Sequence, residues 1–159
     1  MAALVLTSAT LLTGTSWTGT APGSGNPTPS GTIASSTDRS DHVRSISIDM
    51  NVAMQDITSF GDGAFTVSLP GLKSSQIQVE FNQDFAASNV DATFGAGFLA
   101  GTLYYLDVKP TSSARGSTNP SYVYAAYVSS YPAVSNSVGD AATVTVTFDV
   151  VGTFARLTS

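Results

Sequence analysis

Strict alternation of apolar and polar side chains in separate segments constrains the fold of this chain more than any other feature. The apolar positions are Ile46, Ile48, Met50, Val52 and Met54; Ile77, Val79 and Phe81; and Val144, Val146, Phe148 and Val150. Serine, threonine, asparagine, glutamine and acidic residues stand between them. A period of two residues is that of a strand with one buried face. The chain is therefore predicted to be mainly β.

Phe65, Val67 and Leu69 repeat the alternation just before Pro70-Gly71. Proline followed by glycine is typical of a turn, so a strand is expected to end there and the next to begin after it. Together with the neighbouring segments this predicts an antiparallel meander in which each strand has one dry face.

One segment changes period from 2 to 3.6, because Val90, Phe94 and Phe98 are spaced four residues apart. Ser88 is placed as the N-cap of a helix and Gly101 as its end. Gly95 and Gly97 are each expected to weaken this helix by roughly 1 kcal/mol relative to alanine. The helix is therefore expected to depend on Phe94 and Phe98 packing against the sheet.

Two further strands are predicted at 102–109 and 121–131, joined by a polar loop from Pro110 to Pro120. Both have apolar residues on both faces, so something must cover each face. With a first strand at Ala3 to Leu12 and a last at 142–151, we expect about seven strands and one helix. This indicates a β-sandwich or a bent antiparallel sheet with a flanking α-helix.

Residues 13–40 are rich in glycine, proline, serine and threonine and contain few aliphatic residues. They are expected to form a long exposed loop or arm within one domain spanning 1–159. Two interpretations remain open for this segment. It is either an arm that orders only against a neighbouring molecule, or a floppy surface loop.

Only 11% of the residues are charged and the net charge is −5. This disfavours tight binding to a nucleic-acid backbone, which requires clustered lysine and arginine. No lysine or arginine precedes Arg39, so no export signal is expected, and no apolar run approaches the ~20 residues that cross a bilayer. Because cysteine is absent, disulfides and thiolate metal sites are excluded.

Catalytic patterns are missing from the sequence, so we expect no enzyme and no catalytic, cofactor or metal residues. His42 is the only imidazole, and no nucleophile elbow, phosphate loop or zinc motif accompanies it. Asp38 to His42 offers oxygen ligands, but Arg39 would oppose a cation, and Asp and Ser before a strand usually bond to their own backbone.

Two other groups of residues could carry chemistry. Glu80, Asp84 and Asp107 could meet as the paired carboxylates of a glycosidase, although nothing local supports this. The six tyrosines are the only candidates for a sugar-binding platform: Tyr104, Tyr105, Tyr122, Tyr124, Tyr127 and Tyr131. Their strand spacing favours packing in the core or between subunits.

Three stretches in a fixed order resemble major tail tube proteins of long-tailed, non-contractile bacteriophages, especially siphovirus-like phages of actinobacteria. They are SDHVRSISIDMNVAMQDITSFGDGAF (Ser40 to Phe65), FNQDFAASNVDATFGAGF (Phe81 to Phe98) and the end from Val108 to Val150, which contains VGDAATVTVTF. The likeness covers about three quarters of the chain. The segment from Thr13 to Asp38 departs from the family, in which a short turn joins the first two strands.

The resemblance implies a structural virion protein without a cofactor. Six copies would form a ring, hairpins would join edge to edge around a lumen, and rings would stack into the tube that conducts the genome during ejection. DNA would pass without specific binding, since the lumen of this family tends to be acidic. The expected partners are other copies, the terminator, the tape measure and the distal tail protein, with assembly in the host cytoplasm and no membrane. The Pro110 to Pro120 loop could reach an adjacent ring or be an ordinary hairpin loop.

Two other functions remain as alternatives to that of a tail tube subunit. One is another virion component, a tail terminator or a capsid decoration protein, which would also be acidic, β-rich and free of cysteine. The other is a secreted carbohydrate-binding β-domain.

Overall fold

The protein is described here as a computed structural model that covers residues 8–23, 30–61, 63 and 65–158. Its strands are β1 (Thr10–Gly14), β2 (Ser16–Thr18), β3 (Thr32–Ala34), β4 (Thr37–Asp38), β5 (Val43–Asp56), β6 (Ser68–Asn82), β7 (Leu103–Lys109), β8 (Ser121–Ser130), β9 (Thr143–Val150) and β10 (Ala155–Leu157). A short helical segment, η1 (Asp91–Gly95) and α1 (Ala96–Ala100), separates β6 from β7. The mainly β fold with one short helix confirms the predicted class. No helix in the described ranges is long and apolar enough to span a membrane.

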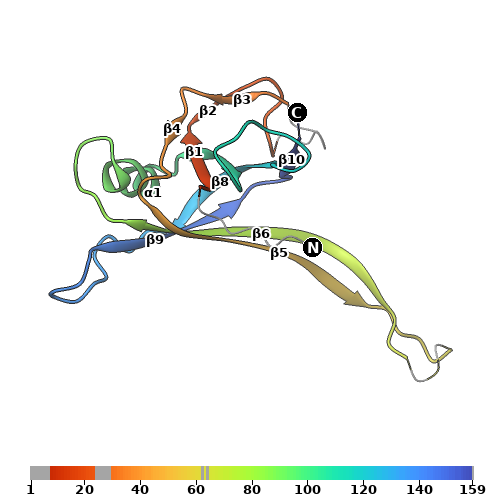
Figure 1. Ribbon diagram of the computed structural model, residues 1–159. Helices are drawn as coiled ribbons and strands as arrows, with labels where there is room; N and C mark the ends of the chain where they lie inside the picture. Colours follow the sequence, from red (N-terminus) through yellow and green to blue (C-terminus); the bar gives the residue numbers. More distant parts are fainter. Residues whose placement is uncertain (1–7, 24–29, 62, 64, 159) are drawn as a thin grey trace.

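Eight strands form one antiparallel sheet in the order β4-β1-β7-β8-β9-β6-β5, with β10 paired to β8, while β2 and β3 pair separately. The sheet bends so that the β5–β6–β9 part and the β1–β4 part lie in different layers (Figure 1). The apolar faces predicted from the alternation point into the space between them: Ile77, Val79, Phe81, Val144, Val146 and Phe148 are each at most 1% exposed. The bend therefore lets one sheet enclose its own core.

Phe94 fixes the helix at the centre of this core. Its ring lies 5.2 Å from that of Phe81, 5.4 Å from Tyr104 and 5.5 Å from Phe148, measured between centroids. Phe98, which was expected to pack beside it, is 43% exposed. One aromatic anchor therefore holds the helix instead of two.

The ends of the helix agree only in part with those predicted from the sequence. Gly101 closes it in the left-handed conformation, as predicted, with φ of 63°. Ser88 does not cap it: its own φ is 66°, and no side chain caps η1. The Asp84 carboxylate organises this entry instead, because it accepts hydrogen bonds from Ala86 N–H at 2.8 Å and from the Asn89 amide at 2.6 Å.

Pro70-Gly71 is not a turn but part of β6, so this prediction was wrong. The chain turns at 57–67, and β5 and β6 form one long hairpin. A register shift between Val52 and Met54 accommodates the dipeptide. Proline is tolerated because β6 pairs with β9 only from Gln76 onward, so at Pro70 it has β5 as its single neighbour.

The segment 13–40, expected to be a loop or arm, contains β2, β3 and β4. The Trp17 ring lies 5.7 Å from that of Tyr105, its Nε1 donates to the Ser30 carbonyl at 2.9 Å, and Ile33 is buried. The segment is therefore anchored to β7 over its described residues. The first strand lies at Thr10–Gly14, and residues 1–7, which include half of the strand expected at Ala3 to Leu12, are outside the described part.

Candidate assembly surface

The outer half of the β5–β6 hairpin projects from the body of the protein (Figure 1). Its two strands remain paired as far as Asp56 and Ser68. Beyond them, Ile57 N–H donates to the Val67 carbonyl at 2.9 Å, and the Thr58 hydroxyl accepts from Val67 N–H at 2.9 Å. Hydrogen bonds from the Thr58 side chain and backbone lower the pKa of the Asp56 carboxyl. The arm is thus an ordered ribbon, and in the described ranges its two strands pair only with each other beyond Gln76.

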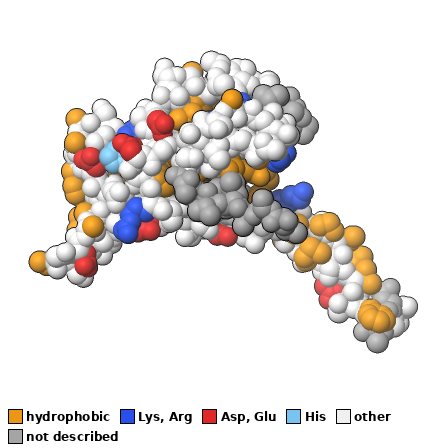
Figure 2. Space-filling model, in the orientation of Figure 1, with side chains coloured by type: hydrophobic (Ala, Val, Ile, Leu, Met, Phe, Trp, Pro, Cys, Tyr) orange, Lys and Arg blue, Asp and Glu red, His pale blue; other side chains and the backbone are white. Residues whose placement is uncertain are grey.

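Apolar side chains cover this arm without being buried. Leu72 is 86% exposed, Phe65 81% and Met54 56%, and Figure 2 shows hydrophobic side chains gathered along the arm. The full set of exposed apolar residues there is Met50, Val52, Met54, Ile57, Phe60, Phe65, Val67, Leu69 and Leu72. Met50, Val52 and Met54 lie on one face of this ribbon and Leu69, which pairs with Gln55, on the other, and exposed apolar surface of this extent marks a contact with another molecule. We call these nine residues the apolar arm.

A second exposed apolar group lies at the opposite end of the molecule, on α1 and the loop between β8 and β9 (Figures 1 and 2). On α1, Leu99 is 86% and Phe98 43% exposed; in the β8–β9 loop, Val134 is 83% and Val138 107% exposed; and Phe85, in the loop before η1, is 61% exposed. We call these five residues the helix-end patch. Two different apolar surfaces at opposite ends allow copies to associate head to tail.

The outer edge of β5 is unpaired along a strand of 14 residues. In the described part of the chain, β6 is the only strand that pairs with β5. A long edge with free N–H and C=O groups is a template for adding a strand from another molecule.

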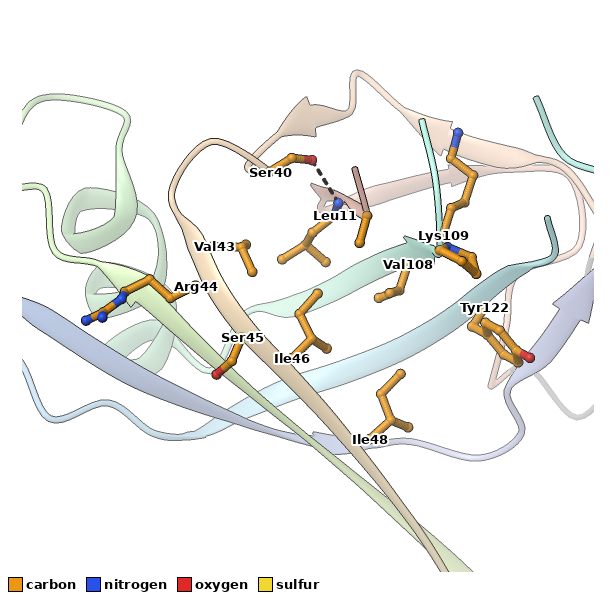
Figure 3. A pocket seen from close by; sticks show the side chains of 12 residues that line it. Leu11, Ser40, Val43, Arg44, Ser45, Ile46, Ile48, Val108, Lys109 and Tyr122 are labelled. Carbon is orange, nitrogen blue, oxygen red and sulfur yellow. Dashed lines mark hydrogen bonds between the residues drawn. The ribbon is translucent and has the colours of Figure 1, made fainter. Parts of the chain in front are cut away.

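An apolar groove of about 540 Å³ opens beside this edge, between β5 and the strands of the other layer (Figure 3). Val43, Ile46 and Ile48 line it from β5, and Leu11, Val108 and Tyr122 line it from β1, β7 and β8. The Ser40 hydroxyl closes one end by accepting a hydrogen bond from Leu11 N–H at 3.0 Å. Among the described residues, the core is therefore incompletely covered where β5 ends the sheet.

The face of β5, β6 and β9 that points away from the core is polar. Asp49 is paired in register with Gln76, and Gln76 with Asp149, whose carboxylate accepts a hydrogen bond from the Gln76 amide at 2.8 Å. Glu80 lies on the same face and binds Arg44 at 3.4 Å. This face thus carries carboxylates, amides and hydroxyls in rows across three strands.

The residues considered for catalysis or metal binding have structural partners. Asp38 accepts hydrogen bonds from the backbone and hydroxyl of Ser40, Arg39 is buried, and His42 lies 3.8 Å from the Asp41 carboxylate. No group of three or more histidine or acidic side chains with metal-binding geometry occurs in the described ranges.

The carboxylates considered for glycoside hydrolysis bind three different sets of residues. Glu80 pairs with Arg44, Asp84 holds the helix entry, and Asp107 pairs with Arg115 at 2.8 Å and with the Ser121 hydroxyl.

The tyrosines also do not form one platform. Tyr104 and Tyr124 are 4% and 0% exposed, and burial raises the pKa of Tyr124 to about 12. Tyr131 donates to the Asp91 carboxylate at 2.8 Å, and burial is the main cause that raises its pKa to about 12. Core packing is therefore the role of the two buried rings.

The Pro110 to Pro120 loop is folded onto itself rather than extended. The Asn119 amide donates to the Thr111, Ser113 and Ala114 carbonyls, and Arg115 reaches back to Asp107. The projecting segment is instead the hairpin that sequence reasoning had divided at Pro70. The signal that could have found it is the series of apolar positions that continues past the predicted turn, from Phe65, Val67 and Leu69 to Leu72.

No protein-family model and no curated protein matches this sequence. Several solved structures match the fold. The SPP1 tail tube, solved by solid-state NMR and cryo-electron microscopy, has a TM-score of 0.63 at 10% identity, over 99% of this chain and 80% of that chain.

Two structures of gene transfer agent particles also match. A chain of the native virion has a TM-score of 0.58 at 17% identity, over 73% of this chain and 85% of that chain. A chain of the tail of the empty particle, refined with C6 symmetry, has a TM-score of 0.57 at 17% identity, over 73% and 82%. This chain therefore has the fold of viral tail tube and tail subunits.

Proposed function

We propose that this chain is a structural subunit of a bacteriophage tail tube of the long-tailed, non-contractile type, and not an enzyme. Its copies form hexameric rings that stack into the hollow tail of the virion and conduct the genome during ejection. The observation that carries the proposal is the apolar arm. In a chain with the tail tube fold, an ordered hairpin projects nine exposed apolar side chains that only another molecule can cover.

Ring formation uses the free edge of β5. A strand from the neighbouring copy pairs with this edge, which removes an aggregation hazard and extends the sheet around a closed barrel. The same neighbour covers the apolar groove beside β5. Six copies related in this way leave no unpaired β5 edge in the ring.

The polar face of β5, β6 and β9 lines the lumen in this assembly. Asp49 and Asp149 place negative charge there, while Glu80 is paired with Arg44, and negative charge repels the phosphates of passing DNA. A lumen of this kind conducts DNA without binding it specifically.

Stacking of rings uses the two apolar ends. The apolar arm of one copy contacts the helix-end patch of a copy in the next ring, a heterologous contact that propagates as a helical polymer. We further propose that the chain forms one domain, that the ends of the tube bind terminator, tape measure and distal tail proteins, and that assembly occurs in the host cytoplasm.

The test is negative-stain electron microscopy of the concentrated protein. Hollow tubes or stacked six-fold rings are expected. Closed single rings that never stack would favour a tail terminator, and a monomer retained on a polysaccharide column would favour a carbohydrate-binding domain.

A double substitution in the apolar arm, Leu69→Ser with Leu72→Ser, sharpens this test. Both side chains are exposed, at 54% and 86%, so the fold is expected to survive while tubes are lost. Val151→Ser is the matched control, because Val151 is 39% exposed but lies outside both apolar surfaces. Tubes formed equally by all three proteins would contradict the role of the arm.

A further inference from the structure

Arg39 is a buried cation without an acidic partner in the described part of the chain. The residue is 5% exposed; its Nη2 donates to the Thr93 hydroxyl at 2.9 Å, and its Nε has no hydrogen-bond partner. Burial lowers the pKa of Arg39, and the nearby charge of Asp41 offsets this only in part. A buried charge that lacks a counter-charge is costly, so Arg39 requires an explanation.

The other five basic residues do not share this situation. Arg44 and Arg115 form ion pairs with Glu80 and Asp107. The three that lack an ion pair, Lys73, Lys109 and Arg156, are exposed or half-buried, so water solvates their charge. Over the ranges that the structure describes, Arg39 alone combines burial with the lack of an ion pair.

Arg39 lines an open depression of about 470 Å³ between β1, the segment joining β3 to β4, and the start of the helix. Most of its other lining side chains carry hydroxyls, including Thr13, Ser35, Ser88 and Thr93, and none is acidic. Ser35 and Ser88 have φ of 52° and 66°, and no other non-glycine residue in the described ranges has a positive φ. Backbone in this sparsely populated region is typical of functional sites.

We propose that this depression is a carboxylate-binding site and that its occupant is an aspartate or glutamate side chain of a second copy of this chain. A guanidinium forms charge-assisted hydrogen bonds with a carboxylate, and the surrounding hydroxyls supply further donors. The chain offers the complementary charge, since it has eleven acidic and six basic residues. Asp140, for example, lies exposed in the loop between β8 and β9 without an ion pair in the described ranges. This inference rests on the proposed function, because self-assembly is what brings the second copy within reach.

The chemistry of the site can be tested on the unassembled protein with acetate as the probe. The protein is labelled with ¹⁵N and kept below the assembly concentration. We follow the Nε–Hε resonance of Arg39 during the titration, and its loss in Arg39→Gln assigns this resonance. A saturable shift with sodium acetate, absent with sodium chloride at equal ionic strength, is expected. Equal responses to the two salts would overturn the carboxylate site.

The source of the carboxylate is tested by assembly. Arg39→Gln is expected to raise the concentration needed for tubes by about tenfold or more, as loss of a buried interfacial charge pair does. Arg156→Gln is the control, because it removes an exposed charge without an ion pair and should leave that concentration unchanged. Equal assembly of Arg39→Gln and wild type would overturn the second-copy occupant while leaving the tail tube proposal intact.

If Arg39→Gln does not fold, substitution of the exposed acidic residues one at a time tests the same contact from the other side. Single Asp→Asn and Glu→Gln variants at exposed acids, beginning with Asp140, leave Arg39 in place. One of them should reproduce the tenfold loss with an unchanged melting temperature, and the absence of any such variant counts against the inference. If the wild type itself never assembles, the proposed function fails together with the second-copy occupant, and the acetate titration still decides whether the depression binds carboxylates.

Discussion

The two halves of the β5–β6 hairpin have the same sequence pattern and opposite surroundings. Near the body, Ile77, Val79 and Phe81 are fully buried beneath the helix and beside β9. In the arm, Met54 and Leu72 continue the apolar content of the same two strands and are 56% and 86% exposed. Alternation thus shows that a strand has an apolar face, but what covers this face is decided by the neighbouring elements. Here one half is covered within the chain, and we propose that the other is covered by a second copy.

The largest expected difference between the halves is in stability. Phe81→Ala removes a fully buried ring packed on Phe94 and should lower the free energy of unfolding by about 3–5 kcal/mol. Leu72→Ala, in the same strand, should change it by no more than about 0.5 kcal/mol. Urea unfolding of the unassembled protein measures both. Similar losses for the two variants would mean that the arm folds back onto the body in solution.

A smaller effect distinguishes the core from the arm through the pH dependence of the free energy of unfolding. Burial raises the pKa of Tyr124 from 10.0 to about 12, so below pH 10 the tyrosine is neutral in both the folded and the unfolded state. As the pH rises from 10 to about 12, only the unfolded state ionises, and the wild type should lose about 1.4 kcal/mol per pH unit from this group. The arm from Asn51 to Leu72 contains no tyrosine, so it contributes nothing to this loss.

Tyr124→Phe isolates the contribution of Tyr124 to this loss of stability at high pH. The Tyr124 hydroxyl is buried and has no hydrogen-bond partner among the described residues, so its removal should be neutral or slightly stabilising at pH 8. At pH 11 the variant should be more stable than the wild type, because it lacks the group that ionises on unfolding. Tyr131 also has a raised pKa but is present in both proteins, so it cancels from the difference. An equal alkaline loss in the two proteins would contradict the assignment to Tyr124.

Periodicity predicted the elements of the body well. β5, β7, β8 and β9 lie within about two residues of their expected bounds, and the helix ends at Gly101 as predicted. The short strands β2, β3 and β4 were missed because strands of two or three residues are too short to show a period.

The candidate sites were harder to predict, for a physical reason in each case. Pro70-Gly71 has the composition of a turn, and only the absence of a second neighbour for β6 makes it acceptable in a strand. Gly97, which seemed to weaken the helix, is needed, since a Cβ there would lie 2.0 Å from the Tyr104 hydroxyl oxygen. Arg39 is exceptional through what is missing around it, and sequence spacing does not record a missing partner.

The smallest expected effect concerns the irregularity at Pro70, where sequence and structure differ most. Pro70→Ala restores an N–H in a stretch of β6 that is exposed and paired on one side only, so the free energy of unfolding should change by no more than about 0.5 kcal/mol. Urea unfolding tests this, and electron microscopy of the concentrated variant should reveal the same assemblies as the wild type. A larger stability change would show that the proline fixes the register shift between Val52 and Met54, and that the arm contributes to the stability of the body after all.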